Sequence, residues 1–333
     1  MPDAVLVLAF LGSAAISLSA SWLLVSRLER LGARLGLSEA LLGVVAALAA
    51  DAPEITTAIT AVAGHQSSIG AGVALGSNVF NLAALLGLAA VVAGRVALHR
   101  RVIVIEGTVA IWVAAVAVVV VAGGVSAGAG IALALALLVP YVAVLGRQRT
   151  WLKRLGARRA WLRWLAQGIG EEEIELEGAV DMRRGRPADA LVASGATAVV
   201  IAASVAMEKS ASAVGGHVGI PEIVLGGLIL AGVTSLPNAV AGIYLARRGR
   251  GAATLSTAMN SNALNVTAGL LVPATIVALG VSSKATTLVA AWYLGLTMFA
   301  LVAAYAGRGL ARAGGALIIV AYLAFVVVLA LAY

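Results

Sequence analysis

The sequence contains no cysteine, three histidines and few charged residues, and each shortage excludes a class of protein. Without cysteine there is no disulfide framework, no thiolate metal site and no cysteine nucleophile. Charged residues make up 11% and hydrophobic residues 62% of the chain, whereas soluble domains have roughly 25% charged and 45–50% apolar residues. Too few polar side chains remain to cover a compact core, so the composition excludes a soluble fold.

Long apolar runs take up most of the chain instead and predict an all-α polytopic membrane protein. A spanning helix needs about 20 apolar residues, and these runs are too continuous for the strands of a membrane barrel. The first run follows Asp3 rather than a basic segment, so we interpret it as a retained span and not as a secretory signal. The ten predicted spans are 4–26, 38–63, 68–93, 102–122, 125–146, 189–207, 221–246, 252–279, 285–306 and 313–332.

The basic residues predict how these spans are oriented. With the N-terminus outside, all of the 23 Lys and Arg except Lys209 and Lys284 fall on the cytoplasmic side, as the positive-inside rule requires. We therefore expect a multi-pass protein of the cell (inner) membrane, embedded in the lipid bilayer, with both termini outside and the loop 147–188 in the cytoplasm. The net charge of +8 reflects this sorting, and it does not indicate a nucleic-acid partner.

The loop 147–188 divides the chain into a first five-helix unit over 1–146 and a second over 189–333. Its segment 151–168 alternates apolar and basic residues, which predicts a helix lying in the headgroup interface. An acidic run follows over 171–177. We interpret this run as part of a solvated linker that pairs with nearby arginines, and a regulatory cation-sensing role is the alternative.

The second half of the chain repeats the first. Glu54 and Asn238 are 184 residues apart, as are Asn78 and Asn262. Because five is an odd number of helices, the two units enter the membrane in opposite directions, and the predicted fold is two inverted five-helix repeats with a site near the midplane. The matching segments are Asp51-Ala52-Pro53-Glu54 with Ser235-Leu236-Pro237-Asn238, and Gly76-Ser77-Asn78-Val79-Phe80-Asn81 with Asn260-Ser261-Asn262-Ala263-Leu264-Asn265.

Two acids lie in the middle of the second predicted span. Asp51 and Glu54 are three residues apart, so both can face one side of a helix, and Pro53 between them removes a backbone donor. A charged carboxylate at the centre of a membrane costs about 2.5–3.5 kcal/mol, and the surrounding spans offer no Lys or Arg before their cytoplasmic ends. Such carboxyls must be protonated or bind a cation. Oxygen ligands of this kind suit Ca²⁺, Na⁺ or Mg²⁺.

These segments resemble the α-repeats of the calcium/cation antiporter superfamily, most closely the sodium/calcium exchanger branch. That family carries Gly-Thr-Ser-x-Pro-Glu and then Gly-Ser-Asn-x-x-Asn or Gly-Ser-Asn-x-x-Asp in each half, and the likeness covers 38–92 and 221–280. The resemblance implies that cations bind at Glu54, Ser77, Asn81, Thr234, Ser235, Ser261 and Asn265. We expect Asn78 and Asn262 to lie behind these ligands and to join helices by hydrogen bonds.

The chain departs from the family pattern at both acidic positions. Ala50-Asp51 stands where the family has Thr-Ser, and Asn238 stands where it has its second glutamate. We include Asp51 and Asn238 among the predicted cation-binding residues, although Asp51 could instead lie behind the ligands. Both acids then belong to the first half, and the site carries a charge of at most −2. The side chains predicted to hold the ion itself are Asp51, Glu54, Asn81 and Asn265.

The predicted function is secondary active cation antiport of the sodium/calcium exchanger kind, with alternating access to one site. No cofactor is expected, and the transported ions are Ca²⁺ with Na⁺ or H⁺. A proton-coupled exchanger is one alternative, because two adjacent carboxyls can share protons. A cation channel is an alternative from a different class. The sequence contains no hydrolase, metalloprotease or nucleotide-binding motif, so we expect neither an enzyme nor a nucleotide partner.

Overall fold

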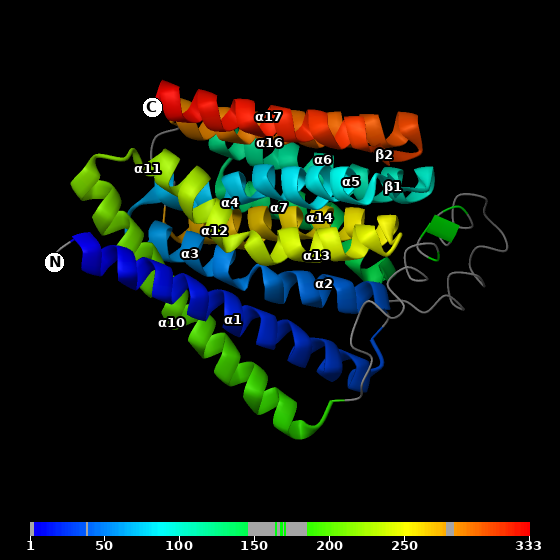
Figure 1. Ribbon diagram of the computed structural model, residues 1–333, viewed down its shortest axis with the longest axis horizontal. Coiled ribbons are helices and arrows are strands. Elements are labelled where there is room, and N and C mark those ends of the chain that lie inside the picture. The colour runs from blue at the N-terminus through cyan, green and yellow to red at the C-terminus, as the bar shows by residue number, and fades with distance from the viewer. Residues whose placement is uncertain are drawn as a thin grey trace.

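The computed structural model describes residues 3–37, 39–145, 164, 167–168, 170, 185–277 and 283–333. Within these ranges the chain is a bundle of helices with one short two-stranded sheet (Figure 1). The interfacial helix and the acidic run predicted over 151–177 lie almost entirely outside the described residues.

The helices follow the order that the apolar runs predict. The first half consists of α1 (Asp3–Leu35), α2 (Glu39–Ala50), α3 (Ala52–Ala63), α4 (Ser67–Asn81), η1 (Leu82–Leu88), α5 (Ala89–Ala93), β1 (Arg95–Ala97), α6 (Arg100–Val121) and α7 (Ala127–Leu145). The second half consists of α10 (Pro187–Val218), α11 (Glu222–Val224), η2 (Leu225–Leu230), α12 (Ala231–Thr234), α13 (Leu236–Arg247), α14 (Gly251–Leu264), η3 (Asn265–Leu271), α15 (Val272–Ile276), α16 (Lys284–Gly307), β2 (Gly309–Ala311) and α17 (Arg312–Ala332). The three segments named η are π-helical.

Each predicted span coincides with one helix or with a run of consecutive helices. Among the described residues, seven helices are long and apolar enough to cross a membrane, and two bent helix pairs raise this number to nine. The remaining predicted span, 252–279, is helical over 251–276 but is not among the nine. The count of ten spans in two inverted repeats therefore stays a prediction.

Two helices are longer than their apolar runs. α1 ends at Leu35 rather than at the predicted position 26, and α10 ends at Val218 rather than at 207. Hydropathy marks where a helix leaves the hydrocarbon, whereas arginine, glutamate and lysine are good helix formers and can continue the helix beyond it.

The core lies around α4 and α14, which are buried over most of their length. Glycines let α4 pack directly on η2. A Cβ atom placed on Gly76 would lie 2.3 Å from the carbonyl oxygen of Gly227, and one placed on Gly72 would lie 2.8 Å from the nitrogen of the same residue. Side chains at these positions would push the two backbones apart, because a Cβ atom cannot approach backbone atoms so closely. Membrane helices depend on this close packing of small residues, since lipid offers no hydrophobic force for their association.

A short sheet closes one end of the bundle. β1 pairs with β2 in antiparallel register, with Val96 opposite Leu310 and Ala97 opposite Gly309. Gly309 has a φ of +129°, and a Cβ atom there would lie 2.3 Å from the Val96 carbonyl oxygen. These strands were not predicted, because three residues are too few to show an alternating pattern.

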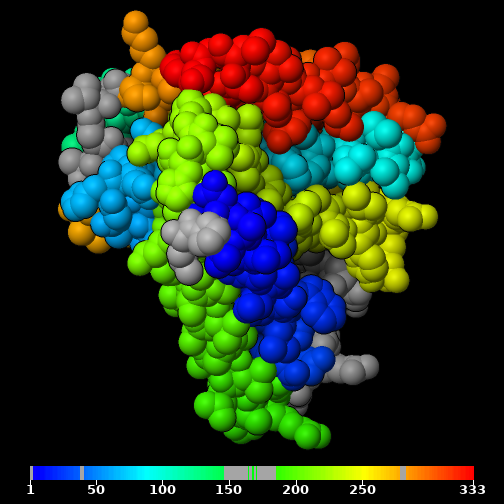
Figure 2. Space-filling view, turned by 60° about the vertical axis from the view of Figure 1, so that its left-hand side comes forward, coloured from blue at the N-terminus to red at the C-terminus, as the bar shows by residue number. Residues whose placement is uncertain are grey.

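α1 and α10 lie side by side and form one face of the molecule (Figures 1 and 2). Near their middle, the Ser17 and Ser204 hydroxyls are 2.8 Å apart and share a hydrogen bond. At the N-terminal end of α1 and the C-terminal end of α10, Asp3 Oδ1 lies 2.7 Å from His217 Nδ1. The pair is thus connected both at mid-length and at the N-terminal end of α1.

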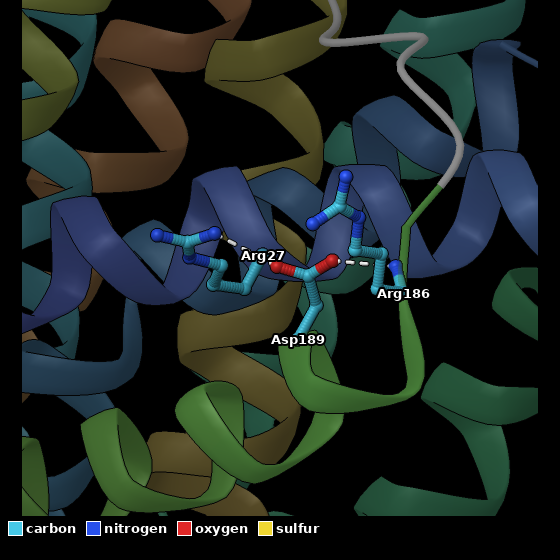
Figure 3. A network of polar contacts seen from close by, with 3 residues as sticks. All are labelled: Arg27, Arg186 and Asp189. Atoms are coloured by element: carbon cyan, nitrogen blue, oxygen red, sulfur yellow. Dashed lines mark hydrogen bonds and ion pairs between the residues drawn. The ribbon is translucent and has the colours of Figure 1, made fainter.

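The other end of this pair is held by one acid at the start of α10. Figure 3 shows the Asp189 carboxylate between Arg27 of α1 and Arg186. Arg27 Nη1 donates to Asp189 Oδ1 at 2.7 Å, and the Arg186 backbone nitrogen donates to Asp189 Oδ2 at 2.6 Å. The second bond caps α10, since the first amides of a helix have no partner within it. Asp189 therefore caps the N-terminal end of α10 and ties it to α1.

Candidate cation-binding site

Two helices break at the prolines of the repeated motifs. α2 and α3 meet at an angle of 51° around Asp51, and the run ending in α12 meets α13 at 48° around Ser235. The two break residues have nearly the same backbone, with φ and ψ of −80° and −4° at Asp51 and of −85° and 1° at Ser235. Pro53 and Pro237 stand in the first turn of the following helix, where a missing N–H costs little.

Ser21 of α1 satisfies the broken end of α2. Pro53 cannot donate to the carbonyl of Ala49, four residues earlier. The Ser21 hydroxyl donates to this oxygen at 2.8 Å and lies 3.2 Å from the carbonyl oxygen of Ala50. Sequence reasoning could predict the unpaired carbonyl from the proline, but not Ser21 as its donor, because that depends on how α1 packs.

Asp51 is fully buried at the first break and accepts two hydrogen bonds from the second half of the chain. Asn238 Nδ2 donates to Asp51 Oδ1 at 2.8 Å, and the Ser261 hydroxyl donates to the same oxygen at 2.7 Å. The other oxygen, Oδ2, is buried without a hydrogen-bond partner. One oxygen of this carboxyl thus contacts α13 and α14, while the described residues give the other no hydrogen-bond donor, and the Glu54 carboxyl lies beside the same acid.

Glu54 is the third residue of α3 and is 1% exposed. Its Oε1 accepts a hydrogen bond from the Ser235 hydroxyl, and its Oε2 accepts one from Asn265 Nδ2 at 3.1 Å. Both donors again come from the second half of the chain. The acid that the sequence places beside Pro53 therefore faces the equivalent break at Ser235.

Neither carboxyl has a cationic partner in the described part of the chain. The ion pairs found there, Arg27–Asp189 and Asp3–His217, belong to the α1–α10 contact. The groups around Asp51 and Glu54 are amides, hydroxyls and each other. Two carboxylates enclosed in this way need a proton or a bound cation for each negative charge.

Four asparagines join α4 to the segment of α14 and η3. Asn78 Nδ2 donates to the Asn262 carbonyl oxygen at 3.0 Å, and Asn262 Nδ2 donates to the Asn78 carbonyl oxygen at 3.2 Å. Asn81 Nδ2 donates to Asn262 Oδ1 and Asn265 Nδ2 donates to Asn78 Oδ1, both at 3.2 Å. Each bond has its counterpart 184 residues away, so the contact is self-complementary.

Several buried oxygens near these groups lack a hydrogen-bond partner. They are Asp51 Oδ2, Ser77 Oγ, Asn265 Oδ1 and Thr57 Oγ1. An oxygen without a donor is costly to bury, and carboxylate, amide and hydroxyl oxygens are the ligands that hard cations prefer. The described residues contain no cluster of three or more Asp, Glu or His, so a cation here would be held by two carboxyls and neutral oxygens.

The structure brings most of the predicted site residues into one hydrogen-bonded network. Its members are Asp51, Glu54, Asn78, Asn81, Ser235, Asn238, Ser261, Asn262 and Asn265. Ser77 is buried in α4 without a partner. Thr234 is buried at the second break, but its hydroxyl donates to the Leu230 carbonyl oxygen of its own helix at 2.9 Å. The cation-binding role of all these residues stays a prediction.

Sequence reasoning missed two further buried residues beside this network. Thr57 follows Glu54 by three residues on α3, and this spacing is a signal that could have found it. Tyr293 of α16 is fully buried and lies beside Asn78. Nothing in the sequence marks this tyrosine, because α16 reaches α4 only through tertiary packing.

The comparisons with known proteins agree with this architecture. The family model described as sodium/calcium exchanger protein matches residues 5–148 and 190–331. The sodium-calcium exchanger NCX_Mj superposes with a TM-score of 0.60 at 20% identity, over 97% of this chain and 98% of that chain. The H⁺/Ca²⁺ exchanger CAX gives 0.71 at 16% identity, over 97% and 82%. Native YfkE gives 0.63 at 16% identity, over 99% and 93%.

At these identities the solved structures show the fold, and the family model shows the family. The comparison with curated proteins found no match. The family model covers both halves of the chain and leaves out the connection 149–189 between them. The two broken helices and their enclosed carboxyls lie within the matched ranges. The chain therefore belongs to the sodium/calcium exchanger protein family and is a multi-pass membrane cation antiporter.

Proposed function

We propose that the chain exchanges Ca²⁺ for Na⁺ through the site between α3, α4, α13 and α14. The observation that carries this proposal is the pair Asp51 and Glu54, which are buried with no cationic partner among the described residues and are surrounded by neutral oxygens and amides. Such a donor set is suited to a hard cation. The cation is the substrate here and not a resident metal.

Charge balance sets the stoichiometry that we propose. With both carboxyls ionised the site carries −2, which one Ca²⁺ or two Na⁺ neutralise. Any excess charge in the low-dielectric midplane is expensive, so we expect one Ca²⁺ to exchange for two Na⁺ without net charge movement. The oxygens that we assign to the ion are Asp51 Oδ2, the Glu54 carboxyl, Ser77 Oγ and Asn265 Oδ1, which are buried beside or within the network.

The self-complementary contacts support two inverted five-helix repeats around this site, over 1–146 and 189–333. Reciprocal bonds such as those between Asn78 and Asn262 are expected where a two-fold axis relates two units. In this family the first helix of each repeat slides across the others. α1 and α10 would take this role, and their shared hydrogen bonds and ion pairs favour movement as one unit. The site would thereby open to one side at a time.

Proton coupling is the second candidate. The structural neighbour CAX is an H⁺/Ca²⁺ exchanger, and two carboxyls close enough to interact can carry protons in place of two Na⁺. Both mechanisms use the same two acids and the same charge balance. They differ only in the ion that neutralises the site after Ca²⁺ leaves.

The deciding experiment is Ca²⁺ uptake into vesicles containing the purified protein. A luminal Ca²⁺ dye reports uptake while outward Na⁺, H⁺ and K⁺ gradients are imposed in turn, at a clamped membrane potential. We expect the Na⁺ gradient to drive uptake and the K⁺ gradient to have no effect, at a rate that does not depend on voltage. Uptake driven only by the H⁺ gradient would select the proton-coupled alternative. Ca²⁺ that moves only down its own gradient, whichever of the other gradients is imposed, would indicate a channel.

We further propose that 147–188 lies in the cytoplasm and that both termini lie outside. Because the chain contains no native cysteine, a single cysteine placed by Gly170→Cys reports its own location. We expect a membrane-impermeant thiol reagent to label it in inverted vesicles and not in intact cells. Labelling from outside intact cells would show that the orientation is the opposite one, and it would not bear on the proposed cation site.

A further inference from the structure

We propose that Asp51 supplies, from the first half of the chain, the carboxyl that the second half lacks at Asn238. The site then has one acid in each of two equivalent residue pairs, although both acids belong to the first half of the sequence. This inference rests on the proposed function, since it assigns the charges that hold the transported cation.

The first step is the pairing across the two breaks. Residues 184 apart are equivalent, so Asp51 corresponds to Ser235 and Glu54 corresponds to Asn238. In one cross-pair, Ser235 at a break donates to Glu54 in the first turn of α3. In the equivalent cross-pair, Asp51 at the other break accepts from Asn238 in the first turn of α13 at 2.8 Å. Each pair contains one acid. In the first pair the acid stands in the first turn of the helix, and in the second pair it stands at the break.

The second step is that the surroundings of the two pairs also correspond. Glu54 accepts a hydrogen bond from Asn265 at 3.1 Å. The equivalent positions, Asn238 and Asn81, lie 3.5 Å apart between Nδ2 and Oδ1. The residue at 238 therefore occupies the same place as Glu54 does in the other half. Only the chemistry differs, because an amide at 238 donates where a carboxylate would accept.

The third step concerns which oxygens remain for a cation. Both oxygens of Glu54 accept hydrogen bonds from the protein. Asp51 accepts both of its bonds on Oδ1, and Oδ2 has no partner. Asp51 and Glu54 already lie beside each other, and an acid at 238 would add a third carboxyl next to Asp51, where like charges would force a further proton onto the group. The amide at 238 thus suits the acid at 51, and the two residues form one unit.

A purely structural role for Asp51 predicts something different. If its carboxyl served only to accept from Asn238 and Ser261, the amide oxygen of an asparagine at 51 could accept the same two bonds, and Asp51→Asn alone would keep Ca²⁺ uptake. If Asp51 supplies a needed charge, Asp51→Asn alone should lose uptake, and an acid returned to position 238 should restore it. The two ideas therefore differ first in the behaviour of Asp51→Asn and then in whether a double variant recovers what that single variant loses.

The test uses two matched sets of variants. Asp51→Ser with Asn238→Glu gives the second pair the same residues as the first pair, Ser235 and Glu54. Asp51→Asn with Asn238→Asp transposes the two existing side chains and leaves their combined volume unchanged. Each double variant is compared with its two single variants and with wild type, in Ca²⁺ uptake by vesicles and in Ca²⁺-dependent thermal stabilisation of the purified protein.

We expect Asp51→Ser and Asp51→Asn alone to lower uptake by about 100-fold or more, because one negative charge must then hold a divalent ion in a buried site. At least one double variant should recover uptake to within about tenfold of wild type, since the charge of −2 is restored. Its thermal stabilisation by Ca²⁺ should return as well. Recovery of both uptake and Ca²⁺-dependent stabilisation would support the proposal that Asp51 supplies the charge that is missing at position 238.

Two results would overturn it. The first is wild-type-like uptake by Asp51→Ser or Asp51→Asn, since Asp51 would then carry no needed charge. The second is a lack of rescue in both double variants while they remain monodisperse and thermally stable. The proposed function is decided separately, by wild-type uptake and its dependence on the Na⁺ gradient. If the wild type transports Ca²⁺ but neither double variant does, the proposed function stands and only the charge-supplying role of Asp51 is rejected.

Discussion

The interior network and the α1–α10 contact hold helices together in opposite ways. In the interior, asparagines such as Asn78 and Asn262 form reciprocal hydrogen bonds between α4 and α14. Between α1 and α10 the ion pairs stand near the helix ends, and the mid-length polar contact found there is the one between Ser17 and Ser204. The interior network therefore sets a geometry, whereas the α1–α10 contact mainly ties two helices to each other.

This difference follows from where charge is tolerated in a membrane. The exposed pair Asp3–His217 is hydrated and contributes little. The more buried pair Arg27–Asp189 joins α1 only to α10, so it does not resist the movement of the two helices over the rest of the bundle. The buried amides and hydroxyls have no water to replace a lost partner. The two acids of the site, Asp51 and Glu54, are held by this second kind of contact, and they are the groups on which transport should depend most.

The largest expected effect is the loss of one carboxyl. Glu54→Gln keeps the shape of the side chain and removes its charge, so the site can no longer neutralise a divalent ion. We expect Ca²⁺ uptake to fall by about 100-fold or more, while the protein still folds and inserts. Glu222→Gln, an exposed acid at the start of α11, is the matched control and should transport normally. Wild-type-like uptake by purified Glu54→Gln would show that Glu54 is not needed to bind the transported cation.

An intermediate effect is expected from breaking the interior network away from the acids. Asn78→Ala removes one hydrogen bond to Asn262 and one from Asn265. We expect the free energy of unfolding to fall by about 1–2 kcal/mol, because hydrogen bonds between membrane helices are individually modest. Asn260→Ala is the control, since Asn260 donates to Ser256 on its own helix.

Thermal unfolding of both asparagine variants in detergent, together with Ca²⁺ uptake in vesicles, measures this difference. Asn78→Ala should lose both stability and uptake, and Asn260→Ala should lose less of each. Equal losses in the two variants would show that bonds between helices matter no more here than bonds within one helix.

The smallest effects are expected at the ends of α1 and α10. Asp189→Asn weakens the contact with Arg27 and the cap of α10, and we expect a fall in Tm smaller than that of Asn78→Ala. Asp3→Asn at the exposed opposite end should leave Tm unchanged. Unfolding scans at low and high salt test both, because salt screens such pairs. A larger loss for Asp189→Asn than for Asn78→Ala would reverse the comparison.

Much of the helical arrangement could be predicted from local pattern. The apolar runs predicted where helices lie, and the backbone donor missing at Pro53 coincides with one of the two breaks. The strands β1 and β2 were not predicted, and neither were the extensions of α1 and α10, because hydropathy records burial in lipid and not the full length of an element. The number of spans that cross the membrane stays a prediction.

The sequence by itself determined the chemistry of the site: two acids, a set of amides and hydroxyls, and two motifs 184 residues apart. Only the tertiary structure decided that Glu54 meets Ser235 and that Asp51 meets Asn238. These partners are more than 180 residues apart, and the packing of α3 against α12 and η3 and of α2 against α14 sets which side chains meet. In sequence both acids lie in one half, and in space each faces the opposite half, because the helices of the two halves interlock around the site.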